Sequence, residues 1–240
     1  MPPRPLTREL LLSAAIDLAD DQGLSALTIR ALAAQVGAKP MAVYHHIPSK
    51  AAILDGVVDE VFSSIALPHP GLPWRSELAS RTRSAREVLL RHAWAVGLLE
   101  SRRRPGPATL RHHDAVLGTL LTDGFAVDRA AHAYALLDSY LYGSVIQEAS
   151  LPFAPEESQA VAAEMLTPSA DAPDSPGAPD AYPHLTRLAA ELIGPGYDFG
   201  DEFEIGLEVV LDGLQRLRDE PHQTRSAHPR TKDRPHVCDQ

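Results

Sequence analysis

The positions of apolar residues along the chain predict a protein built from helices. Apolar residues recur at intervals of three and four over most of the sequence, and alternating runs of β-branched residues are nearly absent. Near the N-terminus, one such stripe is formed by Leu11, Ala14, Ala15 and Leu18. Thr7 is suited to cap this first helix and Gly23 to end it. We therefore predict an all-α fold.

Turn-forming residues divide the first 65 residues into further short helices. Thr28 can cap a second helix, which Gly37 ends. Pro40 fits the first turn of a third helix at about 39–46, because its missing amide hydrogen costs nothing there. Ser49 can then cap a fourth helix that runs to about Ile65. Its apolar face is predicted to hold Leu54, Val57, Val58, Val61 and Ile65.

Beyond a proline-rich connector the helical pattern resumes and continues for most of the chain. The predicted helices lie at about 74–91, 93–101, 107–123, 127–149, 156–166, 184–193 and 201–218. The proline-rich segment 167–183 is typical of a loop. We predict an N-terminal three-helix helix-turn-helix domain at 1–65, a larger helical ligand-binding and dimerisation domain at 66–218, and a disordered tail at 219–240.

The positions of the charged residues along the chain are more informative than the net charge. The formal net charge of −10 argues against a protein whose whole surface coats nucleic acid. However, no acidic residue occurs between Asp21 and Asp55, a stretch that also contains Arg30, Lys39 and Lys50. A segment without carboxylates can approach phosphates without repulsion, although chance composition would also explain it.

The remaining composition bears on the cellular compartment. No run of 18 apolar residues occurs, so we expect no membrane span, and the N-terminus lacks a signal-peptide pattern. The single cysteine, Cys238, cannot form an internal disulfide, which fits a reducing compartment. We therefore expect a cytoplasmic protein.

The stretch from Thr28 to Lys50 has the pattern of a helix-turn-helix. Two short helices that cross steeply need a small residue on the first helix, and Ala33 supplies it. Gly37 supplies the positive φ of the turn, and Val43 is placed to lock the second helix down. An ordinary pair of bundle helices would explain each residue singly, but it explains the combination poorly.

The segment from Leu6 to Ile65 resembles the DNA-binding domain of the tetracycline-repressor (TetR) family. The most specific part is GAKPMAVYHHIPSK, residues 37–50, which follows the family pattern through its recognition helix. The resemblance extends more weakly over the rest of the chain, at Trp94, Arg104-Pro105, Gly124-Phe125 and the segment 203–214. It implies a regulator of transcription, most often a repressor, that binds a palindromic operator in double-stranded DNA as a homodimer.

The resemblance also implies which residues contact DNA. They are Thr28, Arg30, Lys39, Pro40, Met41, Ala42, Tyr44, His45, His46 and Lys50. Lys39 could donate to guanine, while Met41 and Ala42 could contact a thymine methyl. Thr28, Tyr44 and His46, with Lys50 at a helix N-terminus, would bind phosphates, Arg30 could reach a base or a phosphate, and His45 lies on the exposed side. Tyr44 could instead be a half-buried aromatic that packs the domain.

Two apolar stripes are implied to form a four-helix bundle with their copies in a dimer. They comprise Ala133, Leu137, Leu141, Ser144 and Val145 on one helix, and Phe203, Leu207, Val210, Leu214 and Leu217 on another. Both stripes could instead face the core of the same chain. A small, largely apolar effector is expected between residues 94 and 142, near Trp94, Glu100, Arg104, His113, Tyr134 and Asp138. Any one of these polar side chains could be an ordinary surface group.

The effector is not expected to be tetracycline. Glu100 stands where the family's drug-binding members have the histidine that holds the drug's magnesium. Other drug contacts are replaced by Ala66, Arg81, Ala85 and Val116, and only Arg104 and Pro105 match. The sequence thus predicts a shared sensor architecture with a different ligand.

An enzyme is the first alternative and a helical interaction protein without DNA binding is the second. The sequence contains no phosphate-binding glycine loop, nucleophile elbow or zinc-protease motif. The pairs His45-His46 and His112-His113 are poor chelates, because adjacent helical side chains point about 100° apart. We therefore expect no catalytic residues, no metal site and no cofactor.

Overall fold

The computed structural model of the chain describes residues 5–99, 105–151, 157, 160–161, 182–188, 190–191 and 198–220. Within these residues the fold is helical, without a β-strand, and one isolated bridge joins Pro70 to Leu72. The all-α prediction is therefore confirmed. Most of the predicted helix at 156–166, the loop at 167–183 and the tail at 219–240 lie outside the described residues.

The N-terminal helices begin at the residues that the sequence predicts. They are α1 (Arg8–Gln22), α2 (Ile29–Gln35), α3 (Pro40–His46) and α4 (Lys50–Ser63), with a short 3₁₀ turn η1 (Leu24–Ala26) between the first two. The side-chain oxygens of Thr7, Thr28 and Ser49 accept hydrogen bonds from backbone amides three residues further on, at 3.1–3.2 Å. Each hydroxyl satisfies an amide that has no carbonyl partner within the helix, so all three predicted caps are confirmed.

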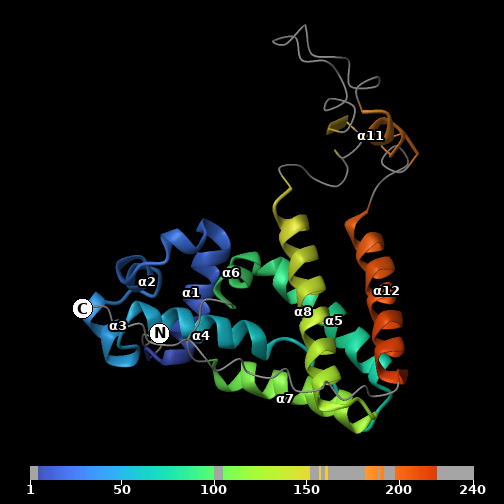
Figure 1. Cartoon of the computed structure of the whole chain (residues 1–240). Helices are drawn as coiled ribbons and strands as arrows, with labels where there is room; N and C mark the ends of the chain where they lie inside the picture. Colours follow the sequence, from blue (N-terminus) through green and yellow to red (C-terminus); the bar gives the residue numbers. More distant parts are fainter. Residues whose placement is uncertain are drawn as a thin grey trace, which may run out of the picture.

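A small hydrophobic core holds these helices together at one end of the molecule (Figure 1). Its buried residues are Leu11, Leu12, Ala14, Ala15, Leu18, Leu27, Leu32, Ala33, Val43, Ile47, Ile53 and Val57. We call this set the small core. Every member is apolar, so the helices pack without any buried charge.

The remaining long helices form a second and larger core. They are α5 (Trp74–Arg91), α7 (Pro107–Thr122), α8 (Val127–Ala149) and α12 (Phe199–Asp219), with η2 (Ala93–Ala95) and α6 (Val96–Leu99) in between. Helix α8 packs against α5, α7 and α12. The short α11 (Pro183–Leu188) contributes no buried residue. We call the buried residues of this bundle the large core.

Helix α4 belongs to both cores. Ile53 and Val57 lie in the small core, whereas Val58, Val61 and Phe62 lie in the large one. Figure 1 shows α4 running from the cluster of α1 to α3 towards α7. Leu54 of the predicted apolar face is only partly buried against the small core, and Ile53, which the prediction omitted, is fully buried there. The domain boundary at residue 65 stays a prediction.

The two stripes that the resemblance assigned to a dimer seam are internal. Ala133, Leu137, Leu141 and Val145 of α8 are at most 1% exposed within the single chain. On α12, Phe203, Leu207 and Leu214 are buried as well. The alternative reading was therefore correct for these residues. Their apolar periodicity reflects packing of α8 and α12 onto the large core, which a sequence pattern cannot distinguish from packing onto a second chain.

Candidate nucleic-acid interface and ligand pocket

The turn between α2 and α3 has the geometry that the sequence predicts. Gly37 has φ 65°, in the left-handed region that favours glycine. The amide of Ala38 donates to the carbonyl of Ala33 at 2.8 Å, and the amide of Gly37 donates to Ala34 at 3.1 Å. This pair of bonds closes the C-terminus of α2 in a Schellman motif and redirects the chain into α3.

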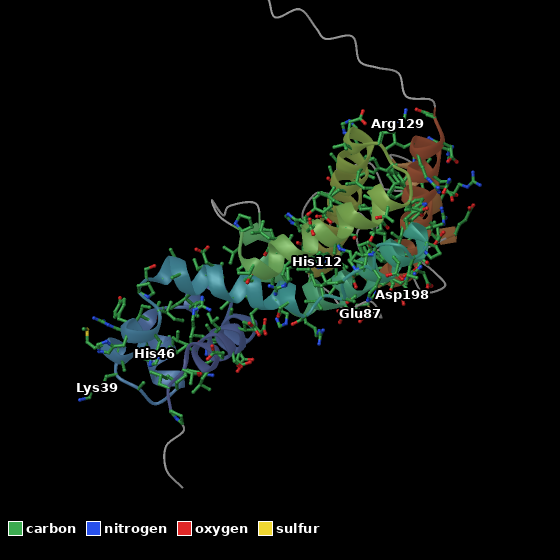
Figure 2. All side chains as sticks on the ribbon, turned by 90° about the horizontal axis from the view of Figure 1, so that it is seen from below. Lys39, His46, Glu87, His112, Arg129 and Asp198 are labelled. Carbon is green, nitrogen blue, oxygen red and sulfur yellow. The ribbon has the colours of Figure 1, made fainter. Side chains whose placement is uncertain are left out.

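One face of helix α3 is buried in the small core, and the opposite face is exposed. Val43 and Ile47 are at most 1% exposed and pack in the small core, while Met41 is 68% and Tyr44 45% exposed. With 45% of its surface exposed, Tyr44 is compatible with both readings, the half-buried aromatic and the DNA contact, and the DNA contact stays a prediction. Figure 2 shows Lys39 and His46 at the far end of the molecule from α12. The helix thus presents one face to the outside, as entry into a DNA groove requires.

The structure brings the predicted DNA-contact residues together on this end. Exposed members of the set are Thr28, Arg30, Lys39, Pro40, Met41, Tyr44, His45, His46 and Lys50, and Ala42 is half-buried. Thr28 uses a hydroxyl lone pair to cap α2, which leaves its hydrogen available to an acceptor such as a phosphate. Lys50 is the first residue of α4, where the amides of the helix N-terminus favour an anion.

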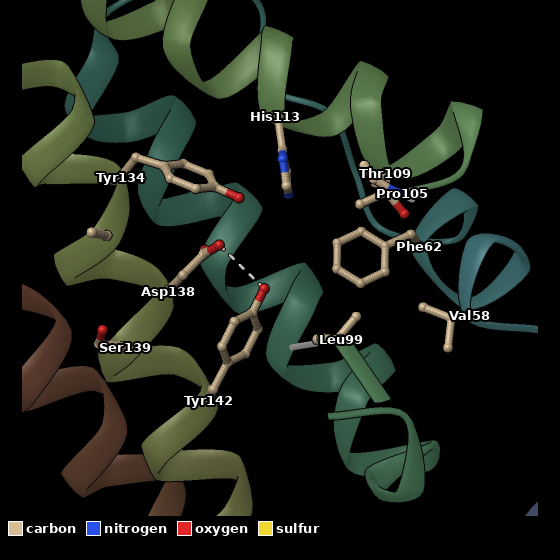
Figure 3. Close-up of a pocket in the computed structure, with 11 residues that line it drawn as sticks. Val58, Phe62, Leu99, Pro105, Thr109, His113, Tyr134, Asp138, Ser139 and Tyr142 are labelled. Atoms are coloured by element: carbon tan, nitrogen blue, oxygen red, sulfur yellow. Dashed lines mark hydrogen bonds between the residues drawn. The ribbon is translucent and has the colours of Figure 1, made fainter. Parts of the chain in front are cut away.

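A cavity of about 440 Å³ lies between α4, α7 and α8 (Figure 3). Its lining residues are Val58, Phe62, Leu99, Pro105, Thr109, His113, Tyr134, Ala135, Asp138, Ser139 and Tyr142. In Figure 3 the apolar side chains of Val58 and Phe62 lie at one end, and Tyr134, Asp138 and Tyr142 lie at the other. An apolar cavity with a few convergent polar groups is typical of a small-molecule site.

The polar end of the cavity is organised around Asp138. The hydroxyl of Tyr142 donates to Asp138 Oδ2 at 3.2 Å, and the ring of Tyr134 meets His113 edge-on at 5.1 Å between centroids. Burial raises the pKa of the Tyr134 phenol, and the charge of Asp138 adds to this. Burial lowers the pKa of His113. Both groups therefore face the cavity in their neutral forms at neutral pH.

Behind this end lies a buried ion pair that sequence reasoning missed. Arg81 donates from Nη1 to Asp138 Oδ1 and from Nε to His112 Nε2, both at 2.7 Å. The three residues are 2%, 7% and 0% exposed in the order Arg81, Asp138, His112. Burial, with the nearby Arg81 charge, lowers the pKa of His112 to about 3, so its ring is neutral. The only sequence signal was Arg81 at a position where other family members contact drug.

The predicted ligand-binding residues divide into three groups. His113, Tyr134 and Asp138 line the cavity. Glu100 and Arg104 lie outside the described residues. Trp94 does not line the cavity, which corrects the prediction for this residue. Its indole nitrogen donates to Asp20 Oδ1 of α1 at 2.6 Å, and its ring packs against both cores. A bulky aromatic at a junction looks like a pocket residue in sequence, because both environments are apolar.

Helix α4 supplies two cavity residues that the sequence analysis did not assign to a ligand site: Val58, which it placed on the apolar face of the helix, and Phe62, which it did not single out. Among the described residues, no helix is long and apolar enough to cross a membrane. In the same part of the chain, the side chains of His, Cys, Asp and Glu form no group of three or more that could hold a metal ion. His45 and His46 are exposed, whereas His112 is buried and His113 faces the cavity.

Two family models match the chain. Residues 11–57 match the model described as bacterial regulatory proteins of the tetR family, and residues 67–218 match the tetracycline-repressor-like C-terminal domain. The first match contains the small core and the helix-turn-helix, and the second contains nearly all of the large core. The two models together therefore cover both halves of the structure.

Individual relatives agree with this assignment. The chain is 30% identical over 212 residues to an HTH-type transcriptional regulator of Saccharopolyspora erythraea, covering 87% of this chain and 84% of the relative. It is 28% identical over 218 residues to the HTH-type transcriptional repressor DrrR1 of Streptomyces coeruleorubidus, covering 90% and 80%. A solved structure of the TetR family protein ActR of Streptomyces coelicolor, in complex with actinorhodin, superposes with a TM-score of 0.73 at 25% identity. That superposition covers 90% of this chain and 98% of ActR.

These relatives are regulators of transcription rather than enzymes, and the exposed helix α3 gives this chain the corresponding DNA reader. Members of the family are typically homodimers that leave their DNA when a small molecule binds. The chain belongs to the TetR family and is a helix-turn-helix transcriptional regulator that binds DNA.

Proposed function

We propose that this chain represses transcription as a homodimer bound to a palindromic operator, and that a small-molecule effector in the cavity beside Asp138 releases it. The observation that carries the proposal is the exposed outer face of α3. The inner face of this helix is anchored in the small core by Val43. A two-fold dimer doubles the base contacts and requires two half-sites one helical turn or more apart.

Base reading is assigned to the N-terminal turn of α3. Lys39 is the exposed residue that could donate to guanine, and Met41 offers an apolar contact for a thymine methyl. Thr28, Tyr44, His46 and Lys50 are assigned to the phosphate backbone, and Arg30 to a base or a phosphate. Because this face has few cations, much of the affinity would come from hydroxyls and helix-end amides.

The dimer surface is assigned to the outward faces of α8 and α12, in place of the internal stripes. Leu136 and Ile146 of α8 are 53% and 51% exposed, and Ile205 and Val209 of α12 are 61% and 65% exposed. A groove between these helices is lined by Gly143, among others, where an added Cβ would meet no atom within 4 Å, so a second pair of helices has room to approach closely there. Four large apolar side chains on two neighbouring helices indicate a surface that a second copy covers.

The cavity suits a mostly apolar effector with a hydrogen-bonding group at one end. Phe62, Val58 and Leu99 would contact its apolar part, and Tyr142, Tyr134 and His113 would meet its polar group. The related ActR was solved with actinorhodin bound, so a family member of this similarity holds a small molecule. Tetracycline is disfavoured for this chain, because Arg81, Ala85 and Val116 are buried in the large core and do not line the cavity.

The proposed function is tested by selecting bound duplexes from a random DNA pool with the full-length chain. We expect an inverted repeat to be enriched. Lys39→Ala should then weaken binding to that sequence by about 1–3 kcal/mol and relax the preference at one base pair, whereas Tyr44→Phe should weaken binding to all sequences alike. Arg91→Ala, at an exposed position of α5, is the matched control and should bind as the parent does. Recovery of no enriched sequence would overturn the proposal.

Dimerisation has its own test. Val209→Asp places a charge on the exposed apolar face of α12 and should shift the protein to monomer in analytical ultracentrifugation, with loss of operator binding. Leu110→Asp, at a 54% exposed position of α7 away from this face, is the control and should stay dimeric. A Val209→Asp protein that remains a dimer would move the interface elsewhere.

A further inference from the structure

The first turn of α7 is capped by another helix. Its N-cap is Gly106, which has no side chain, and Pro107 has no amide hydrogen. The next two amides, of Ala108 and Thr109, both donate to the carboxylate of Asp59 on α4, at 3.2 Å and 3.0 Å. The hydroxyl of Thr109 donates to the same oxygen at 3.2 Å. One carboxylate thus binds two of the first-turn amides that have no carbonyl partner within the helix.

The side chain of Asp59 lies so close to Gly106 that position 106 has no room for a side chain. A Cβ added to Gly106 would lie 2.8 Å or less from Asp59 Cβ, Cγ and Oδ1. The backbone of Gly106 has φ −77° and ψ 172°, which any residue adopts, so glycine is needed here for space rather than for backbone freedom. Alanine at position 106 would push the carboxylate away from the amides that it binds.

The cavity adjoins this contact on both sides. Thr109 and Pro105 line it from the α7 side, and Val58 and Phe62 line it from α4. Figure 3 shows these four side chains together at the apolar end. A molecule that enters this end therefore touches both helices next to the bond that joins them.

The other half of α4 belongs to the DNA reader. Ile53 and Val57 are buried in the small core, where α4 packs against α1, and the same core contains Leu32 of α2 and Val43 of α3. Any change in the angle between α4 and α7 would therefore displace α3 as well, because tightly packed side chains transmit motion rather than absorb it. By contrast, the contact of Asp20 with Trp94 also joins the two cores, but neither residue lines the cavity.

We propose that Asp59 is the positioning residue that couples cavity to DNA reader: its capping of α7 fixes the angle of α4, and an effector acts by disturbing that cap. The effect on DNA binding rests on the proposed function, whereas the contact by which Asp59 of α4 holds α7 is a property of the single chain. Coupling between two sites of a protein typically changes an affinity by about 5- to 150-fold.

The experiment measures one distance within the chain by pulsed electron paramagnetic resonance. Spin labels are placed at Gln35→Cys on α2 and Ala131→Cys on α8, both exposed positions, in a Cys238→Ser background. Labelled chains are diluted into excess unlabelled protein, so that each dimer holds at most one labelled chain. The two variants that break the cap are Asp59→Ala and Gly106→Ala. Their controls are Glu60→Gln, an exposed carboxylate one residue away, and Gly97→Ala, where a Cβ meets nothing within 4 Å.

We expect both cap variants to broaden or shift the distance distribution and to weaken binding to the selected operator about tenfold, while both controls match the parent. Folded cap variants with the parent's distances would overturn the inference. If Asp59→Ala does not fold, Asp59→Asn and Gly106→Ala carry the test. The distance is measured without operator or effector, so it tests the role of Asp59 independently of the proposed function. If the distance shifts in the cap variants but the parent binds no operator, the role of Asp59 is supported and the proposed function is overturned.

Discussion

The two cores of this protein differ in what they bury. The small core contains only apolar side chains, and the residues assigned to DNA lie on its surface. The large core surrounds a charged pair, Arg81 with Asp138, and a neutral His112, all less than 10% exposed. Its cavity reaches the same Asp138.

This difference follows from the tasks of the two regions. A surface that reads DNA needs a rigid support, and an apolar core provides rigidity without the cost of desolvating charge. A cavity that recognises a small molecule needs polar groups held in place away from water, so the surrounding core must contain their partners. The comparison predicts that removing one partner of the buried ion pair in the large core lowers the free energy of unfolding more than straining the backbone beside the small core does.

The largest effect is expected on removing one member of the buried pair. Arg81→Met leaves the Asp138 carboxylate buried without its cation, which should lower the free energy of unfolding by about 3–5 kcal/mol. Urea unfolding followed by circular dichroism measures this. Arg91→Met, at an exposed position of the same helix, is the control and should change stability little.

A double variant sharpens the same comparison. Arg81→Met with Asp138→Leu removes both charges, so most of the lost stability should return, because no uncompensated charge stays buried. If the single variant is as stable as the parent, the pair is not the desolvated contact that the structure shows, and the contrast between the cores disappears.

The second prediction concerns acid. The pKa of His112 is about 3 in the folded chain and near 6.5 when unfolded, so between these values only the unfolded chain binds the proton. Stability from this residue is complete above pH 6.5 and falls as the pH drops, by about 1.4 kcal/mol per unit. His112→Gln should therefore show a shallower loss of stability between pH 6 and 4. His132→Gln, at an exposed position, should keep the parent's slope.

The smallest effect is expected in the turn between α2 and α3, beside the small core. Gly37→Ala puts a side chain on a residue with φ 65°, where a Cβ meets no atom within 4 Å. Its cost is therefore backbone strain alone, about 1 kcal/mol. Thermal unfolding measures it against Gly97→Ala, which is helical and equally uncrowded. Equal melting temperatures for the two variants would show that the turn carries no strain.

Local signals predicted much of the fold. Thr7, Thr28 and Ser49 cap helices where expected, and α5 and α8 have the predicted bounds, since caps and breaks depend on neighbours in the chain. The cavity was predicted in part. His113, Tyr134 and Asp138 line it, but Trp94 lies at the junction of the cores, and nothing in its neighbourhood distinguishes these two apolar settings.

By itself the sequence determined the helices, their order and the helix-turn-helix, because these depend on side chains within a few residues of one another. Tertiary structure decided which face of α8 and α12 is internal, how Arg81 reaches Asp138 across 57 residues, and that Asp59 of α4 caps α7. Such contacts join residues far apart in the chain, and helical periodicity marks that a face is buried without naming what covers it.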